Sequence, residues 1–122
     1  MESAIILLDN EQIDDAVSLT YYSMYNMLTA LLRKTGIKCE NHMRSIIILK
    51  ELFNLDNYKI LSAKTERVDK QYYVDFKVTR EQVEKMIEEA KEFNSLLYSF
   101  IEKMTSKEVS KYRDELNKSL NE

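Results

Sequence analysis

Glycine and proline are nearly missing from this 122-residue chain, which contains one glycine, Gly36, and no proline. Folds rich in β-strands need turn residues at intervals of about 8–12 positions, and this chain cannot supply them. We therefore predict an all-α protein, an antiparallel bundle of four to five helices. The single glycine also excludes a glycine-rich phosphate-binding loop.

Cysteine and histidine are equally scarce, with only Cys39 and His42. One cysteine excludes an internal disulfide and a cysteine-based zinc site, and so few ligands argue against a transition-metal centre within one subunit. We predict no metal and no cofactor. The formal charge of −3 gives no general attraction to nucleic acid, so any contact with RNA has to come from a local basic patch.

Long apolar runs are also missing, and the opening segment MESAIILLDNEQ is too short and acidic for a signal peptide. The chain is therefore expected to be cytoplasmic, with no membrane contact. Hydrophobic residues make up 44% and charged residues 32% of the chain, which is a globular composition. We predict a helical bundle over residues 1–104 and a C-terminal helical tail over residues 105–122.

The segment 13–34 is expected to be the central helix of the bundle. Its apolar residues recur every three or four positions, and such a helix would be about 30 Å long. Asp9 or Asn10 is predicted to cap it, with Gln12 completing a capping box. At its other end, Gly36 suits the left-handed position that follows a helix.

Four further helices follow from similar signals. Asn41 is a candidate cap for a helix over about 41–53, whose broad apolar set predicts burial on most sides. A weaker pattern runs from Tyr58 to about Tyr73, and alternating residues at 73–78 predict an extended connector. Capping boxes at Thr79–Gln82 and Thr105–Glu108 begin two more helices. The first carries a heptad seam that predicts parallel or antiparallel packing on the central helix: Val83, Met86, Ala90, Phe93, Leu97, Phe100 and Met104.

Arg67 is the most informative polar residue, because Tyr72 follows it at about one helical turn. An arginine and a tyrosine facing one groove can hold a phosphate and stack on a base, and Tyr73 can take part. The simpler interpretation is an exposed arginine paired with Asp69 or Glu66. His42 is likewise either a structural histidine beside a helix cap or a catalytic group.

The tyrosines at 21, 22 and 25 are interpreted first as core residues with satisfied hydroxyl groups. Tyr22 projects away from the main apolar stripe, so it is our candidate for a subunit interface.

Four stretches in order resemble the HEPN domain superfamily, in particular its small stand-alone prokaryotic members. They are DAVSLTYYSMYNMLTALLRKTGI, NH at 41–42, RVDKQYY at 67–73 and TREQVEKMIEEAKEF. The resemblance covers about residues 3–103. It implies a helical bundle that often forms a homodimer. It also implies either ribonuclease activity through an Arg-x(4–6)-His motif or pairing with a minimal nucleotidyltransferase as a toxin and antitoxin, in which a tyrosine can accept AMP.

The chain departs from the pattern of this family at several positions. Arg67 matches the motif arginine, but Tyr72 stands where an Arg-x4-His enzyme has its histidine. Leu19 replaces the usual arginine before Tyr21–Tyr22, and Tyr25–Asn26 replaces a Phe-His pair. Tyrosine has a reference pKa near 10, which makes it a poor general base at neutral pH.

Three functional hypotheses follow. The leading one is a dimeric binding or regulatory protein, partner of a minimal nucleotidyltransferase or of RNA, in which Arg67 contacts phosphate and Tyr72 or Tyr73 is a polar partner or modification acceptor. The second is a divergent metal-independent ribonuclease that uses Arg67, Tyr72 and His42 as catalytic residues. The third is a structural adaptor that binds a partner helix.

Overall fold

The computed structural model describes residues 1–72 and 79–120, and the side chains of residues 68–72 and 120 are outside that description. Within these residues the chain forms six helices and no strand, which confirms the all-α class. The predicted connector at 73–78 lies outside the described residues. The helices are α1 (Glu2–Asp9), α2 (Ile13–Lys34), α3 (His42–Glu51), α4 (Tyr58–Tyr72), α5 (Arg80–Lys103) and α6 (Ser106–Leu120).

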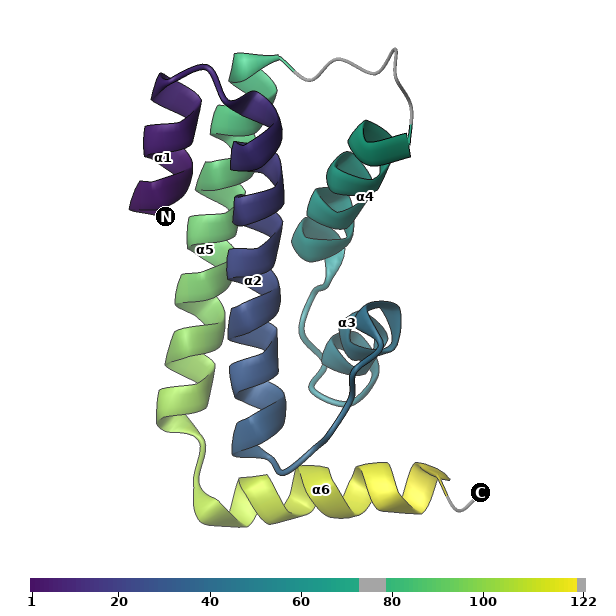
Figure 1. The fold of residues 1–122 in the computed structure, drawn as a ribbon. Coiled ribbons are helices and arrows are strands. Elements are labelled where there is room, and N and C mark those ends of the chain that lie inside the picture. The colour runs from purple at the N-terminus through teal and green to yellow at the C-terminus, as the bar shows by residue number, and fades with distance from the viewer. Residues whose placement is uncertain (73–78, 121–122) are drawn as a thin grey trace.

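Helix α2 is the centre of the bundle, as the sequence predicts. It contacts α1, α3, α4 and α5, and its packing with α5 is the most extensive. Figure 1 shows that α2 and α5 run side by side in the same direction, whereas α1 and α4 run the opposite way. Of the two orientations that the seam left open for α2 and α5, the structure has the parallel one.

The heptad seam of α5 forms the core with the apolar stripe of α2. Six of its seven side chains are buried and Phe100 is partly buried, while Tyr21, Met24 and Leu28 of α2 are fully enclosed. Burying side chains of this size is worth about 1.5–3 kcal/mol each, so this contact stabilises the bundle more than any other.

The end of α2 is fixed by Gly36, whose φ of 74° lies in the left-handed region. The amide of Gly36 donates to the carbonyl of Arg33, and the amide of Ile37 donates to that of Leu32. These two bonds form a Schellman motif, which satisfies carbonyl groups that a helix end otherwise leaves open. The prediction that Gly36 takes the left-handed position after this helix is confirmed.

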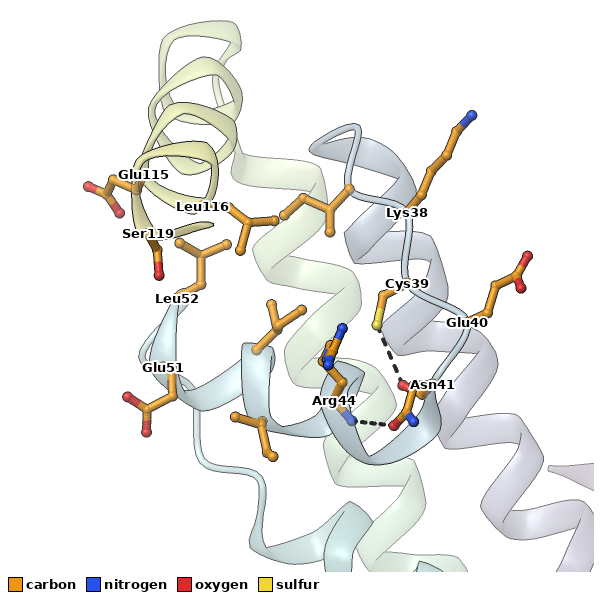
Figure 2. A pocket seen from close by; sticks show the side chains of 13 residues that line it. Lys38, Cys39, Glu40, Asn41, Arg44, Glu51, Leu52, Glu115, Leu116 and Ser119 are labelled. Carbon is orange, nitrogen blue, oxygen red and sulfur yellow. Dashed lines mark hydrogen bonds between the residues drawn. The ribbon is translucent and has the colours of Figure 1, made fainter. Parts of the chain in front are cut away.

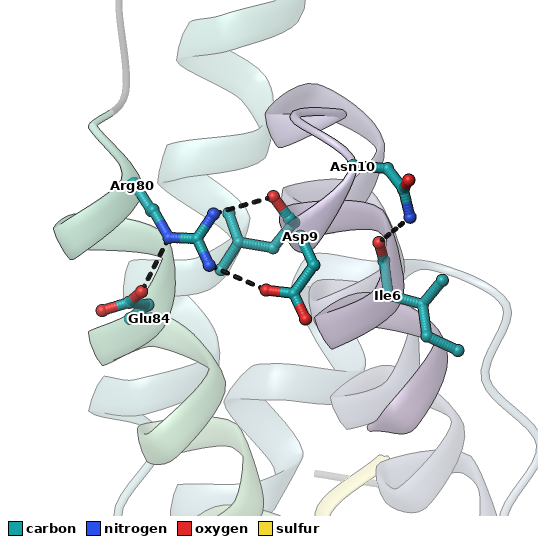
Figure 3. Close-up of polar contacts among 6 residues, drawn as sticks. Ile6, Asp9, Asn10, Arg80 and Glu84 are labelled. Carbon is teal, nitrogen blue, oxygen red and sulfur yellow. Dashed lines mark hydrogen bonds and ion pairs between the residues drawn. The ribbon is translucent and has the colours of Figure 1, made fainter.

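Two predicted capping boxes are confirmed, and one predicted cap is wrong. Thr79 and Gln82 exchange both expected bonds, as do Thr105 and Glu108. The residue before α2 is Gln12, which makes no side-chain cap bond. Neither of the predicted caps is available: Asn10 bonds back to the carbonyl of Ile6, and the carboxylate of Asp9 binds Arg80 (Figure 3).

Arg80 ties the first turn of α5 to the end of α1. Its Nη2 lies 2.7 Å from Asp9 Oδ1, its Nη1 donates to the carbonyl of Leu8 at 3.1 Å, and its Nε donates to Glu84 Oε1 at 3.0 Å. Figure 3 shows the guanidinium between the two carboxylates. This fork explains why Asp9 faces α5 instead of capping α2, because its carboxylate accepts a charge-assisted hydrogen bond from Arg80.

The prediction that α3 is buried on most sides is wrong. Ser45, Ile46 and Leu49 are buried, but Met43 and Ile47 are 42% and 48% exposed. The reason is that α3 lies at the edge of the bundle, where one face packs on α2 and the opposite face has no covering helix (Figure 1).

Helix α6 lies across one end of the bundle (Figure 1). The ring centroid of Tyr112 is 4.8 Å from that of Phe53 and 6.3 Å from that of Phe100, and Arg113 Nε donates to the carbonyl of Thr35 at 3.0 Å. The division into a bundle and a tail stays a prediction; α6 packs on the bundle through the partly buried side chains of Val109, Tyr112 and Leu116.

Candidate functional site: a tyrosine–histidine cluster beside Arg67

Three helices meet at the best-supported candidate site. Helix α2 contributes Tyr21, Tyr22 and Tyr25, the first residue of α3 is His42, and α4 contributes Arg67. The side chain of Asn41 accepts a bond from the amide of Arg44 at 2.9 Å, so the helix starts at His42. This cap places the only imidazole of the chain against the aromatic face of α2. We call Tyr21, Tyr22, Tyr25 and His42 the tyrosine–histidine cluster.

His42 is enclosed by all three tyrosines. Its Nδ1 lies 2.9 Å from the hydroxyl of Tyr21. Its ring stacks on that of Tyr25, with centroids 3.8 Å apart and planes 18° apart, and meets the ring of Tyr22 edge-on at 6.4 Å. The hydrogen bond and the stack together fix the orientation of the imidazole, so His42 has the structural partners that the simpler interpretation requires and is still only partly buried.

Arg67 approaches the same rings from α4. Its Cζ is 4.6 Å from the ring centroid of Tyr22 and 5.6 Å from that of Tyr21, and its Nη2 donates to the hydroxyl of Tyr22 at 2.7 Å. A guanidinium over an aromatic face is stabilised by the ring quadrupole. Arg67 therefore has a fixed position, although no ion pair joins it to Glu66 in the described part of the chain.

Unused hydrogen-bonding capacity remains around Arg67. Its Nε is buried and lacks a partner among the described residues, and the same holds for Oε2 of Glu66. A guanidinium has five N–H donors, and leaving a buried donor unmade costs about 1–3 kcal/mol. Arg67 thus keeps donors that a ligand or a small movement can satisfy.

The Tyr21 hydroxyl and the His42 imidazole both stay neutral near pH 7, because their surroundings shift both pKa values away from the charged forms. Burial raises the pKa of Tyr21 to about 12, a rise that the nearby charge of Arg67 partly offsets. Burial also lowers the pKa of His42 below its ordinary value of 6.5, and the positive charges of Arg67 and Lys64 lower it further. We assign the Tyr21 hydroxyl as donor to Nδ1, which leaves the imidazole proton on Nε2.

The lowered pKa of His42 makes folding sensitive to mild acid. Below about pH 6.5 the unfolded state takes up a proton that the folded state resists, so stability falls with pH. We expect wild-type protein to lose more stability between about pH 7.5 and 5.5 than the His42→Gln variant, measured by urea unfolding at both values. Equal losses of unfolding free energy in the wild type and in His42→Gln would contradict a lowered pKa of His42.

The structure brings two of the predicted site residues together. Arg67 and His42 contact the same two tyrosine rings, although 25 positions separate them in the chain. Tyr72 is the last residue of α4, but its side chain, like the whole of Tyr73 and the Asp69 side chain, lies outside the described residues. Their proposed roles stay predictions.

The prediction that Tyr21 is a core residue with a satisfied hydroxyl group is confirmed, because Tyr21 is fully buried and its hydroxyl bonds to His42. Sequence reasoning did not identify His42 as that partner, nor the bond between Tyr22 and Arg67. The role of Tyr22 at a subunit interface stays a prediction. One signal was available, because a fully buried tyrosine needs a partner for its hydroxyl and the chain offers a single histidine.

A small cavity of about 260 Å³ lies on the other side of Tyr22, between α1 and α2. Leu19 and Asn26, two of the positions where this chain departs from the pattern of the family, both line it. The amide of Asn94 on α5 donates at 3.0 Å to the hydroxyl of Ser23, which also lines the cavity. The partly exposed ring of Tyr22, at 39% exposure, therefore borders both this cavity and Arg67.

Two other kinds of site are absent from the described residues. These residues contain no group of three or more histidine, cysteine or carboxylate side chains placed to hold a metal ion. None of their helices has the length and apolar character that spanning a membrane requires.

The fold and site define a helical-bundle protein with an arginine, a histidine and clustered tyrosines at the junction of three helices. Comparison of the sequence with known families matches the HEPN domain over residues 1–100, and the chain belongs to this family. Membership associates the chain with nucleotide- or RNA-related function. Neither the curated proteins nor the solved structures gave a match.

Proposed function

We propose that this protein binds a phosphate-bearing ligand, a nucleotide or RNA, at Arg67 beside the tyrosine–histidine cluster. The proposal is supported by the contacts of the Arg67 guanidinium. It is held by Tyr22 at 2.7 Å, its Nε has no hydrogen-bond partner, and no carboxylate is paired with it in the described part of the chain. An arginine that is oriented by a tyrosine hydroxyl and has no carboxylate partner among the described residues is suited to a phosphate, which its terminal nitrogens can bind.

The surrounding side chains complement this role. Lys64 lies one turn before Arg67 on α4, and its charge acts on His42 together with that of Arg67. These two cations form the local basic patch that an acidic chain needs for an anionic ligand. The partly exposed ring of Tyr22 offers a face on which a base can stack. Tyr72, the last residue of α4, and Tyr73, which follows it in the sequence, remain proposed ligand contacts.

Replacing Arg67 by alanine is expected to weaken binding of AMP, ATP or a short RNA by about 10- to 100-fold, since charged hydrogen bonds contribute about 1.5–3 kcal/mol. Titration followed by two-dimensional NMR locates the site, and calorimetry gives the affinity. Arg33→Ala is the matched control, because Arg33 is an exposed arginine at the far end of α2.

Shifts that leave out Arg67 and His42, or equal affinities for the two arginine variants, would contradict the site. Wild-type protein that binds none of these ligands would contradict the function itself. Thermal unfolding of each variant, without ligand, separates lost binding from lost fold.

A metal-independent ribonuclease is the second candidate, and one observation favours it. The structure supplies a histidine next to Arg67 from α3, where the family motif supplies it from the same helix. A neutral imidazole with its proton on Nε2 is able to donate that proton to the leaving oxygen of a cleaved phosphodiester. Cleavage of the RNA used in the titration, in the presence of a chelator and lost in Arg67→Ala and His42→Gln, would favour this candidate over binding alone.

The partner we propose, on the family resemblance, is a minimal nucleotidyltransferase in a cytoplasmic toxin–antitoxin pair. Tyr72 and Tyr73 are its proposed acceptors for AMP. Incubation with such an enzyme and ATP would add the mass of one AMP group, and peptide mass spectrometry would locate it. A modification at any other tyrosine would contradict the assignment of these two residues.

A further inference from the structure

The small cavity between α1 and α2 is a neighbour of the Arg67 site, because Tyr22 belongs to both. The hydroxyl of Tyr22 accepts a bond from Arg67 at 2.7 Å, and Tyr22 also lines the cavity. A larger cavity of about 1020 Å³ lies between α3 and α6 (Figure 2), but neither Arg67 nor any residue of the tyrosine–histidine cluster lines it. A ligand held by Arg67 can therefore extend past Tyr22 into the smaller cavity, which we call the α1–α2 cavity.

The volume of the α1–α2 cavity, about 260 Å³, limits what can enter it. Pockets that enclose drug-sized ligands measure about 300–1,000 Å³. Because this cavity is smaller, it fits one flat ring system and excludes a base pair or two stacked bases.

Three polar side chains line the α1–α2 cavity: Ser3 from α1, and Ser23 and Asn26 from α2. Within the described part of the chain, neither Ser3 nor Asn26 forms a side-chain hydrogen bond. The amide of Asn26 presents a donor beside an acceptor, and so does the Watson–Crick edge of a nucleobase. An unpaired base offers this matching edge, whereas a base within a duplex has already used it.

Ser23 is oriented by Asn94 of α5, whose amide donates to its hydroxyl at 3.0 Å. Because that bond uses the Ser23 oxygen as an acceptor, its own proton is left for an acceptor on a ligand. The Oδ1 of Asn94 is buried and has no partner among the described residues, which is rare for a polar atom. The chain itself thus satisfies the polar groups on this side of α2 only in part.

Apolar groups complete the lining of the cavity. Ala4 and Leu19 lie beside the ring of Tyr22, which is 39% exposed. Apolar walls with a few placed polar groups are typical of small-ligand sites. Stacking on an aromatic side chain is a common way for a protein to hold an unpaired base.

We propose that the α1–α2 cavity binds a single unpaired base of the ligand whose phosphate binds Arg67. A nucleotide bound in this way spans the side chain of Tyr22, and Asn26 and Ser23 bond to the edge of its base. The inference rests on the proposed function, since the phosphate contact brings the base to the cavity. It restricts the ligand to a mononucleotide or a single-stranded RNA, and it gives α1 a part in binding.

AMP and ribose 5-phosphate test the proposal, because they share the sugar and the phosphate and differ by the base. Two-dimensional NMR is expected to show shifts at Arg67 with both ligands, and further shifts at Ser3, Ser23 and Asn26 with AMP alone. AMP should also bind about 5- to 100-fold more tightly, as expected for one stacked base.

Asn26→Leu removes the amide and keeps a side chain of similar size. It should weaken AMP binding about 3- to 10-fold and leave the affinity for ribose 5-phosphate unchanged. Asn117→Leu is the matched control, because Asn117 is an exposed asparagine on α6, and it should change neither affinity. Arg67→Ala should weaken both ligands, which separates the phosphate contact from the base contact.

Single-stranded and duplex RNA of the same sequence provide a second comparison. The single strand should shift the three polar residues of the cavity, and the duplex should not, because its base edges are already paired.

Equal affinities for AMP and ribose 5-phosphate, with shifts confined to the Arg67 site, would overturn this inference and leave the proposed function standing. An Asn26→Leu variant that binds AMP as tightly as the wild type, or weakens both ligands alike, would also overturn it. A wild type that binds neither ligand would contradict the proposed function and this inference together. Circular dichroism of each variant, without ligand, checks that the bundle is folded.

Discussion

Phe93→Ala is expected to lower the free energy of unfolding by about 3–5 kcal/mol, the largest loss that we predict for a single substitution. Phe93 is 2% exposed and lies in the middle of the heptad seam, where α5 packs along α2. Removing its ring leaves a cavity between two helices that are held on both sides, so the surrounding side chains cannot fully collapse into it. Domains of this size have a total stability of about 5–15 kcal/mol, and the variant should retain only part of it.

Urea unfolding followed by circular dichroism measures the loss. Tyr98→Ala is the control, because Tyr98 is an aromatic residue of the same helix with 58% of its surface exposed. It should change stability by no more than about 0.5 kcal/mol. A loss below about 1 kcal/mol for Phe93→Ala would contradict the central packing of α2 against α5.

Gly36→Ala is expected to cost about 2–3 kcal/mol, from two separate causes. An alanine at a φ of 74° is strained by about 1–2 kcal/mol. Its Cβ would also lie 2.7 Å from Nη2 and 2.8 Å from Nε of Arg113, which is too close for either atom. The guanidinium must therefore move, and its bond to the carbonyl of Thr35 is lost at a cost of about 1 kcal/mol.

A double-mutant cycle separates the two causes. In an Arg113→Ala background only the backbone strain remains, so Gly36→Ala should cost about 1 kcal/mol less than in the wild type. Urea unfolding of the four proteins gives this coupling energy. The same cost in both backgrounds would show that Arg113 does not occupy the place beside Gly36 that holds α6 against α2.

Local chemistry made several parts of this fold predictable from sequence. The capping box at Thr79, the cap at Asn41 and the left-handed glycine at Gly36 each act within a few residues, so their bonds form in whatever bundle the helices build. The prediction that Asp9 caps α2 was wrong because the bond that Asp9 makes is not local. Its partner Arg80 is 71 positions away, and nothing near Asp9 indicates that this guanidinium will be within reach.

The sequence predicted which residues belong to the candidate site, but only partly how they are arranged in space. Arg67 and His42 stood out because arginine in a polar segment and a lone histidine are informative by themselves. Their placement around the same tyrosine rings depends on contacts between Arg67 and Tyr22, 45 positions apart, and between Tyr21 and His42, 21 positions apart. Such pairs are set by how α3 and α4 pack on α2, which periodicity does not specify.

By itself, the sequence determined that this protein is a helical bundle with α2 at its centre, and it carried the HEPN resemblance that the family comparison confirmed. Scarce glycine and proline left no other class of fold, and helix periodicity and capping are local properties of the chain. The tertiary structure alone decided that Arg67 is held by Tyr22, that Tyr21 holds His42, and that α3 leaves Ile47 exposed beside α6. These features follow from the way separate helices pack, and packing depends on the shapes of side chains far apart in the sequence.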